Sequence, residues 1–243
     1  MRRPAVCASL WGLAGAAMTG GENADVLIIG AGPAALFAVF QLGIYGLRCH
    51  LVDGLDKAGG QCAVLYPDKP IYDVPGFSQI DGDELTERLL AQAAPFDPHF
   101  SFGRTVMDGA PVGHGRWELR LDDGTCIRAG YVILAAGLGL FSMPAGGRTD
   151  EAQLVPGPVA DWPFARSRGG FSVDPATYET SCAGIFAVGD ACDYPGKVKL
   201  ILSGFHEAAL ATQEIRKRVA GGGRVPIEYT TTSKRIWERL GRS

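Results

Sequence analysis

The feature that most constrains this chain is a strand–turn–helix–strand pattern between residues 25 and 53. An apolar run, Val26 to Ile29, is followed at once by the turn sequence GAGPAA and then by an apolar segment that suits a helix. A second apolar run ends in Asp53. Apolar runs of this kind are typical of strands buried on both faces of a parallel sheet. The pattern therefore predicts an α/β fold of the Rossmann type.

The residues of this turn have properties that suit a dinucleotide. Gly30 allows a tight turn off the strand, and Gly32 has no Cβ, so a pyrophosphate can approach the backbone closely. Pro33 and Ala34 begin the helix, whose first N–H groups and positive dipole end favour a phosphate. Asp53 follows about 20 residues later and can accept hydrogen bonds from ribose hydroxyls. The motif alone leaves open whether the dinucleotide is FAD or a nicotinamide nucleotide.

The composition is that of a globular chain. Its 243 residues are 47% hydrophobic and 20% charged, which is enough apolar material for a substantial core. The formal net charge is −3, so nothing points to nucleic acid. The apolar run at residues 5–18 is too short to span a bilayer, and we expect no membrane association.

The six cysteines predict free thiols used as small apolar side chains in a reducing cytoplasm. They form no CxxC pair, which argues against a dithiol–disulfide active site, and they have no metal-ligand spacing with the four histidines. Residues 1–23 differ from the rest and resemble a poor secretory signal. We expect them to be a disordered extension, or one that arises from an upstream start codon with Met18 as the natural first residue.

The rest of the chain reads as further elements of α/β type. An alternating segment, Gly115 to Leu121, predicts a half-buried antiparallel strand, and Asp122-Asp123-Gly124 predicts a hairpin turn. The expected strands after Asp53 are 100–107, 115–121, 125–129, 131–137 and 184–190, with helices at 85–94 and 200–220. The expected fold is thus a parallel sheet with helices and a three-stranded antiparallel meander.

Several longer motifs resemble one known family. They are GAGPAA (30–35), GGQCAVLYPDKPIYDVPGF (59–77), ILAAGLGLF (133–141), VDPATYETSCAGIFAVGDACDYPGKVKLILSGFHEAA (173–209) and EYTTTS (228–233). Together they resemble the thioredoxin-reductase-like ferredoxin–NADP reductases over nearly all of residues 24–236. The resemblance implies a glutathione-reductase-like, two-dinucleotide fold and an FAD-dependent oxidoreductase.

The resemblance also implies which residues contact FAD. It implies no catalytic residue and no metal ligand in this chain. Besides Gly30, Gly32, Pro33 and Ala34 at the pyrophosphate, the matching positions are Asp53 at the adenosine ribose, Gln61 and Tyr66 near the flavin ring, Val106 at the adenine, Phe141, Asp190 at the ribityl chain, and Thr230 or Thr231 in the tail near the ring.

The chain departs from this family between its two FAD-binding parts. Family members insert a second Rossmann domain for NADPH there, whereas roughly fifteen residues separate Phe141 from Gly157, and a βαβ unit takes about 30. We therefore expect four segments: an N-terminal extension (1–23), a first FAD-binding half (24–141), a connection that replaces the NADPH domain (142–170), and a second FAD-binding half with the tail (171–243).

The expected activity is electron transfer between FAD and an acidic, ferredoxin-like carrier, with NADPH turnover in doubt. From Asp193 onward the sequence has ten Lys or Arg residues and five Asp or Glu residues, which gives this segment a local charge of +5. These charges are either solvated helix faces or a docking surface for the acidic partner. Homodimers are usual in the family, so a homodimer is a further expectation.

Two alternatives remain open. One is a non-catalytic FAD-binding remnant that acts as a partner or electron-transfer subunit. The other is a nicotinamide-dependent dehydrogenase with a single Rossmann domain. The chain lacks a Ser-Tyr-Lys set and a catalytic histidine near the expected site, which disfavours the second alternative.

Overall fold

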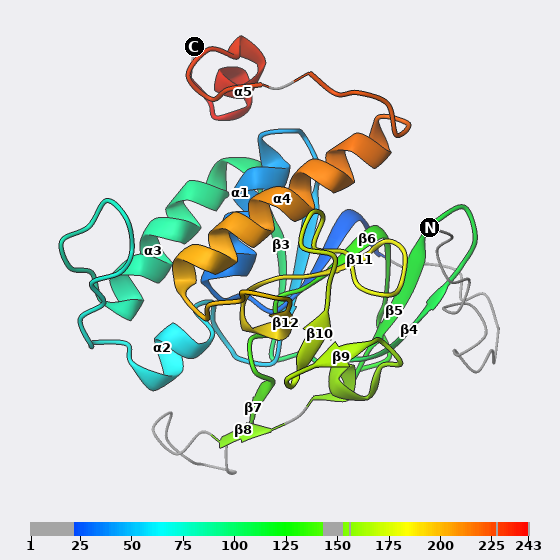
Figure 1. Ribbon diagram of the computed structural model, residues 1–243, viewed down its shortest axis with the longest axis horizontal. Helices are drawn as coiled ribbons and strands as arrows, with labels where there is room; N and C mark the ends of the chain where they lie inside the picture. Colours follow the sequence, from blue (N-terminus) through cyan, green and yellow to red (C-terminus); the bar gives the residue numbers. More distant parts are fainter. Residues whose placement is uncertain (1–21, 143–152, 156, 227, 243) are drawn as a thin grey trace.

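The computed structural model describes residues 22–142, 153–155, 157–226 and 228–242 (Figure 1). Nearly all of the expected N-terminal extension and part of the expected connection lie outside the described residues. The first half contains β1 (Glu22–Ile29), α1 (Pro33–Gly43), β2 (Cys49–Asp53), α2 (Gln61–Leu65), α3 (Gly82–Ala93), the 3-10 turn η1 (Ala94–Phe96), β3 (His99–Phe102), β4 (Val106–Pro111), β5 (Trp117–Leu121) and β6 (Cys126–Leu134). The second half contains β7 (Leu140–Ser142), β8 (Gln153–Val155), η3 (Pro158–Asp161), β9 (Arg166–Ser167), β10 (Gly170–Ser172), β11 (Ile185–Ala187), η4 (Gly189–Ala191), β12 (Cys192–Asp193), α4 (Ile201–Val219) and α5 (Lys234–Arg239).

A seven-stranded sheet forms the centre of the fold. Its strand order is β3-β2-β1-β6-β5-β4, and β11 also pairs with β6. β1 runs parallel to β2 on one side and to β6 on the other. The side chains of Val26, Leu27 and Ile28 are fully buried, as expected of a strand that is covered on both faces. The Rossmann-like α/β fold predicted from residues 25–53 is thus confirmed.

β6 is one continuous strand, whereas the sequence predicted two strands on either side of Gly130. Its first half pairs antiparallel with β5, and its second half pairs in parallel with β11. β1 pairs with β6 across Gly130 and keeps it extended. The glycine permits this close approach, because a Cβ there would lie 3.2 Å from the Asp25 carbonyl oxygen. β4, β5 and β6 together form the expected antiparallel meander.

The prediction of a single strand at 100–107 was wrong, because the chain crosses from one edge of the sheet to the other within this segment. β3 pairs in parallel with β2 at one edge, and β4 pairs antiparallel with β5 at the other. Between them Gly103 adopts a φ of +63°, which ends the extended run. Phe100, Phe102 and Val106 all pack into the core, so the apolar pattern does not report the turn.

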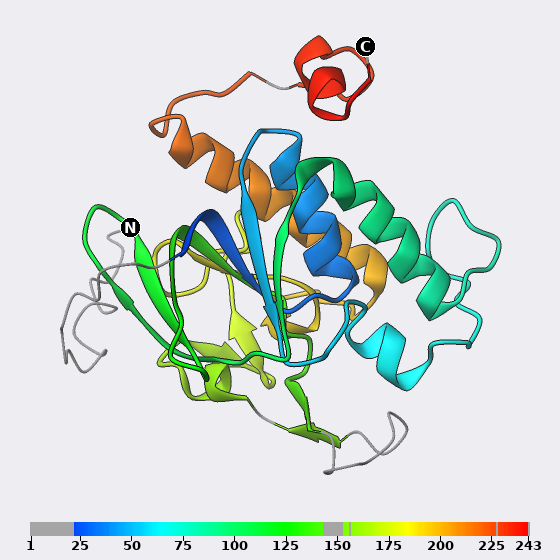
Figure 2. The same ribbon diagram turned by 180° about the vertical axis from the view of Figure 1, so that it is seen from behind.

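Helices α1, α3 and α4 lie side by side along the sheet (Figures 1 and 2). α1 contacts both of the others and is apolar almost all round, because its neighbours cover it. The side chain of Asp81 caps α3 by accepting a hydrogen bond from the Glu84 N–H at 2.7 Å. α3 ends at Ala93, close to the end that Pro95 predicts. α4 occupies nearly the whole of the segment predicted as a helix at 200–220.

Short strands occupy the described part of the connection. β7 pairs with β8, and β9, β10 and β12 form a small three-stranded sheet. Nothing in the described part of the chain is a helix long and apolar enough to cross a bilayer. Four described cysteines are free thiols, whereas Cys182 is disulfide-bonded, so the expectation of thiols throughout fails at that residue.

The C-terminal tail docks at the far end of α1, away from the glycine turn. The guanidinium of Arg239 donates a hydrogen bond to the Ile44 carbonyl at 2.7 Å, and Ile236 is fully buried. Arg216 of α4 donates to Glu228 at 2.7 Å and so holds the start of the tail. α5 consequently lies at the opposite end of the molecule from the paired strands β7 and β8 (Figure 1).

Candidate functional site

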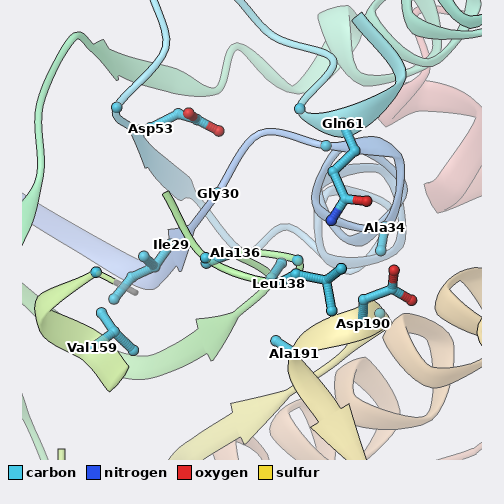
Figure 3. A pocket seen from close by; sticks show the side chains of 18 of the residues that line it. Ile29, Gly30, Ala34, Asp53, Gln61, Ala136, Leu138, Val159, Asp190 and Ala191 are labelled. Atoms are coloured by element: carbon cyan, nitrogen blue, oxygen red, sulfur yellow. The ribbon is translucent and has the colours of Figure 1, made fainter. Parts of the chain in front are cut away.

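A cavity of about 370 Å³ lies at the carboxyl end of β1. Its walls come from both halves of the sequence: the glycine turn, the end of β2, α2, the segment after β6, η3 and η4. Figure 3 shows Asp53 at one end of the cavity and Asp190 toward the other, with Gly30 between them and Ala34 beside Asp190. The volume is within the range of small-molecule sites. A cavity with carboxylates on opposite sides suits a hydroxyl-bearing ligand that reaches from one to the other.

Gly30 and Gly32 are glycines for different reasons. Gly30 has a φ of +110°, and a Cβ there would lie 2.4 Å from the Ala135 carbonyl oxygen, so the fold itself requires this glycine. Gly32 has an ordinary φ of −76°, and the nearest atom to a Cβ there would be 3.9 Å away. The protein therefore has room for a side chain at Gly32. A residue kept bare beside a cavity is expected where a ligand approaches the backbone.

The start of α1 presents unpaired N–H groups to the cavity. An α-helix that begins at Pro33 leaves the N–H groups of Ala34 and Ala35 without an acceptor in the helix. No side chain caps this end, and no acidic residue lies in the first turn. The end of α1 thus keeps its donors and its positive dipole end available to an anion.

The carboxylate of Asp53 is held by backbone donors. Oδ2 accepts a hydrogen bond from the Ala31 N–H at 2.6 Å, and Oδ1 accepts one from the Leu55 N–H at 2.9 Å. Burial raises the pKa of Asp53 above its ordinary value, and these two hydrogen bonds oppose the rise. Each oxygen retains a second lone pair for a ligand hydroxyl.

Gln61 and Tyr66 come from α2 and its C-terminal end. Both line the cavity, and the Gln61 amide lies so close to Gly137 that a Cβ there would be 2.6 Å from Nε2. The Cys62 thiol donates to the Tyr66 hydroxyl at 3.6 Å. Burial raises the pKa of both Tyr66 and Cys62, so both side chains keep their protons at neutral pH. The phenol ring of Tyr66 is therefore a neutral aromatic wall.

The structure brings most of the residues predicted from the sequence into one cavity, but not all of them. Val106, at the start of β4, also lines it. Phe141 lies in β7, and its side chain is outside the described residues. Thr230 and Thr231 are exposed and do not line the cavity in this chain. The Thr230 carbonyl accepts from Trp237 Nε1 at 2.6 Å, within the tail that docks beyond α1.

The cavity also has walls that the sequence did not predict. Val159 in η3, Arg166 and Gly169 come from the connection, and Leu138 and Lys199 complete other parts of the rim. The connection is rich in Pro and Gly and has no apolar periodicity, so sequence patterns gave no indication that it would fold back onto the site. The pairing of β10 with β12 explains this return, because β12 directly follows η4.

Ion pairs engage several of the cations after Asp193. Glu207, Glu214 and Glu228 are already counted in the local charge of +5, and Glu179 lowers it by one. Lys197 pairs with Glu207, Arg216 pairs with Glu228, and Arg218 pairs with Glu179 and Glu214. These cations are not available to a partner. Lys199 is exposed at the rim of the cavity and is the better-placed cation.

The chain is similar over nearly its whole length to proteins named ferredoxin–NADP reductase. The protein from Mesorhizobium japonicum is 31% identical, and the match covers 92% of this chain and 99% of the relative. The one from Leptothrix cholodnii is 32% identical, with 98% and 96% covered. The first match spans 340 aligned positions, more than the 243 residues of this chain, so a substantial part of the relative has no counterpart here.

Solved structures show the same fold at low sequence identity. A thioredoxin reductase from Gloeobacter violaceus matches with a TM-score of 0.68 at 15% identity and covers 87% of this chain. A ferredoxin-flavin thioredoxin reductase from Clostridium acetobutylicum matches with a TM-score of 0.64 at 16% identity and covers 83%. No family model matches. On the strength of the curated relatives, the chain belongs to the ferredoxin–NADP reductase family of flavoprotein oxidoreductases.

Proposed function

We propose that the cavity binds FAD and that the protein transfers electrons between this flavin and a ferredoxin-like protein. The observation that carries the proposal is the bare backbone at Gly32, where the protein's own atoms leave room for a side chain and the cavity begins. The uncapped start of α1 beside it suits a pyrophosphate. Asp53 and Asp190, at opposite ends, suit the hydroxyl groups of the ribose and the ribityl chain. These residues fit the group.

The side chains of the site would bind and orient the flavin rather than exchange protons with it. Bound FAD supplies electron transfer in steps of one or two electrons. The amide of Gln61 and the ring of Tyr66 would bound the flavin ring, and Tyr66 is neutral at working pH because burial raises its pKa. Val106, at the other end, would meet the adenine through its backbone. Phe141 belongs to the same proposal by family resemblance.

We further propose that this chain has no nicotinamide site of its own, so that NADPH turnover is weak or absent. Two observations support this. The alignment with relatives leaves a substantial part of them without a counterpart. Among the described residues between β6 and β9, only the two short strands β7 and β8 and the turn η3 occur, and the ten residues 143–152 are too few for a βαβ unit. Residues 24–141 and 171–243 are the two halves of one FAD-binding domain, and 142–170 replaces the second domain.

Because the chain belongs to this family, we also propose that its partner is a ferredoxin-like protein. On the same ground we propose that it forms a homodimer and is located in the cytoplasm. An acidic iron–sulfur protein would meet Lys199 at the rim of the cavity, and electrostatic steering would make its binding weaken with salt. The alternative of a non-catalytic FAD-binding subunit is favoured by the same missing domain.

One purified sample tests the proposal. We expect a yellow protein that releases FAD on denaturation, is reduced by light with a sacrificial donor, and then reduces ferredoxin. With NADPH and an artificial acceptor we expect turnover far below that of a full-length relative run in parallel. A colourless protein that does not bind added FAD would refute the flavin site, and normal NADPH turnover would refute the missing-domain argument. A reduced flavin that passes no electrons to ferredoxin would favour the non-catalytic subunit.

A further inference from the structure

A buried ion pair stands directly behind the cavity, outside its lining. Lys197 lies in the loop after β12 and its side chain is 2% exposed, while Glu207 lies in α4 and is 0% exposed. Removing two charges from water is costly unless both have well-placed partners. The partners of this pair therefore indicate what it holds in place.

The pair binds both sides of one residue, Gly189. The Gly189 N–H donates to Glu207 Oε2 at 2.6 Å, and Lys197 Nζ donates to the Gly189 carbonyl at 2.9 Å. These two groups belong to the two peptide planes on either side of the Gly189 Cα. Anchoring both planes fixes the two dihedral angles of Gly189, which has a φ of +66°. The direction of the next residue, Asp190, is set by the same anchors.

Neighbouring groups complete this arrangement. The Tyr194 hydroxyl donates to Glu207 Oε1 at 2.9 Å, and the Cys192 thiol lies 3.3 Å from the Gly189 carbonyl. Burial, and next to it the charge of Glu207, raise the pKa of Cys192 to about 12, so it remains a hydrogen-bond donor. Gly204, one turn before Glu207 in α4, packs directly against Gly189, since a Cβ there would be in van der Waals contact with the Gly189 Cα at 3.5 Å.

We propose that Lys197 and Glu207 are positioning residues that hold Gly189 so that the Asp190 carboxylate faces the flavin. The inference rests on the proposed FAD site, since Asp190 is the group through which the pair would act. It assigns a purpose to two charged residues that do not reach the cavity themselves.

The chain offers a matched control pair. Arg218 and Glu179 form another largely buried ion pair, and Glu179 also accepts a backbone hydrogen bond, from the Gly184 N–H at 2.8 Å. Neither residue lines the cavity. A general loss of stability from removing buried charges would appear in both pairs, whereas a positioning effect on Asp190 belongs to Lys197 and Glu207 alone.

The experiment uses the full chain and removes both side-chain partners of Gly189 together, as Lys197→Met with Glu207→Met, so that no buried charge is left alone and no acceptor remains for the Gly189 N–H. We expect the Kd for FAD to rise at least tenfold, and the control, Arg218→Met with Glu179→Met, to change it less than twofold. In the flavin-free protein, hydrogen exchange of the amides at 188–192 should become at least tenfold faster, with β1 unchanged. If the double variant does not fold, Glu207→Asp keeps the charge but withdraws the oxygen from Gly189, and the same two changes are expected.

A cycle with Asp190→Asn tests whether the pair acts through Asp190. In that background, removing the pair should raise the Kd by less than twofold. The inference would be overturned if removing the pair raised the Kd for FAD as much in the Asp190→Asn background as in the wild type. It would also be overturned if the control pair raised the Kd equally, or if hydrogen exchange of the amides at 188–192 did not change. A wild-type protein that binds no FAD would instead refute the proposed function, and the exchange comparison would still decide whether the pair holds Gly189.

Discussion

At the scale of single residues, a substitution at Gly32 can show whether the glycine is needed for FAD binding or for folding. Gly32→Ala places a methyl group where the protein has space, so the free energy of unfolding of the flavin-free protein should change by less than about 1 kcal/mol. The same methyl group meets the pyrophosphate, and we expect FAD affinity to fall at least tenfold, about 1.4 kcal/mol. Urea unfolding and fluorescence titration measure the two effects.

Gly223→Ala is the matched control for this variant, because that glycine is exposed, lies outside the cavity lining, and a Cβ there would meet nothing within 4 Å. It should leave both quantities unchanged. An unaltered FAD affinity in Gly32→Ala would contradict the placement of the pyrophosphate.

Asp53 gives the site a pH dependence. Its carboxylate must be ionised to accept two ribose hydroxyls while it also accepts two backbone N–H groups. Because burial raises its pKa above 3.8, the carboxylate is protonated at a higher pH than an exposed aspartate. FAD affinity should therefore fall as the pH falls through that raised pKa. Equilibrium dialysis across the acid range should show this fall in the wild type, and Asp53→Asn should bind weakly with little pH dependence.

At the scale of elements, the contact between α1 and α4 depends on the absence of side chains. A Cβ on Gly204 would lie 3.1 Å from the Ala34 Cβ, at the end of α1 that faces the cavity. Gly204→Val should therefore push the helices apart and cost about 1–3 kcal/mol of stability. Chemical denaturation measures this, with Val219→Ala at an exposed position of α4 as the control. Equal stability of the two variants would mean that the helices separate without strain.

Releasing the tail helix α5 tests whether Thr230 or Thr231 contacts the flavin. α1 is 11 residues long, about 16 Å, and α5 contacts the end of it that lies away from the cavity. Ile236→Asp should release α5, which would appear as faster hydrogen exchange at 234–239, and FAD affinity should stay within about twofold. A large loss of affinity would instead support the sequence-based prediction that Thr230 or Thr231 reaches the flavin ring.

At the scale of the whole molecule, the cavity joins the two halves of the sequence, so a ligand in it should stabilise the entire fold. FAD at 100 times its Kd should add about 2.7 kcal/mol to the free energy of unfolding. For a chain of this size that corresponds to roughly 5–10 °C in melting temperature. Calorimetry with and without FAD tests this, and separate melting of two parts would contradict a single cooperative unit.

The fold was largely predictable because its first βαβ unit is local. Strand, turn, helix and acidic residue follow one another within residues 25–53, and their chemistry dictates the site. The crossing at Gly103 and the continuity of β6 were not predictable, since each depends on which distant strand the backbone meets. The same holds for Val159 and Arg166, which reach the cavity only because β10 pairs with β12. Lys197 and Glu207 lie ten residues apart in the segment 173–209, and their shared contact with Gly189 arises only when α4 folds back beside η4.

The position of β11 beside β6 has a consequence for synthesis on the ribosome. Until residues 185–187 emerge, the second half of β6 presents an open strand edge to other nascent chains. If translation ended before this point, the edge of β6 would have no partner strand and could pair with another chain. We therefore expect a fragment that stops at residue 142 to aggregate more on translation than one that stops just past Asp190, because both lack α4 and only the shorter one leaves this edge of β6 open.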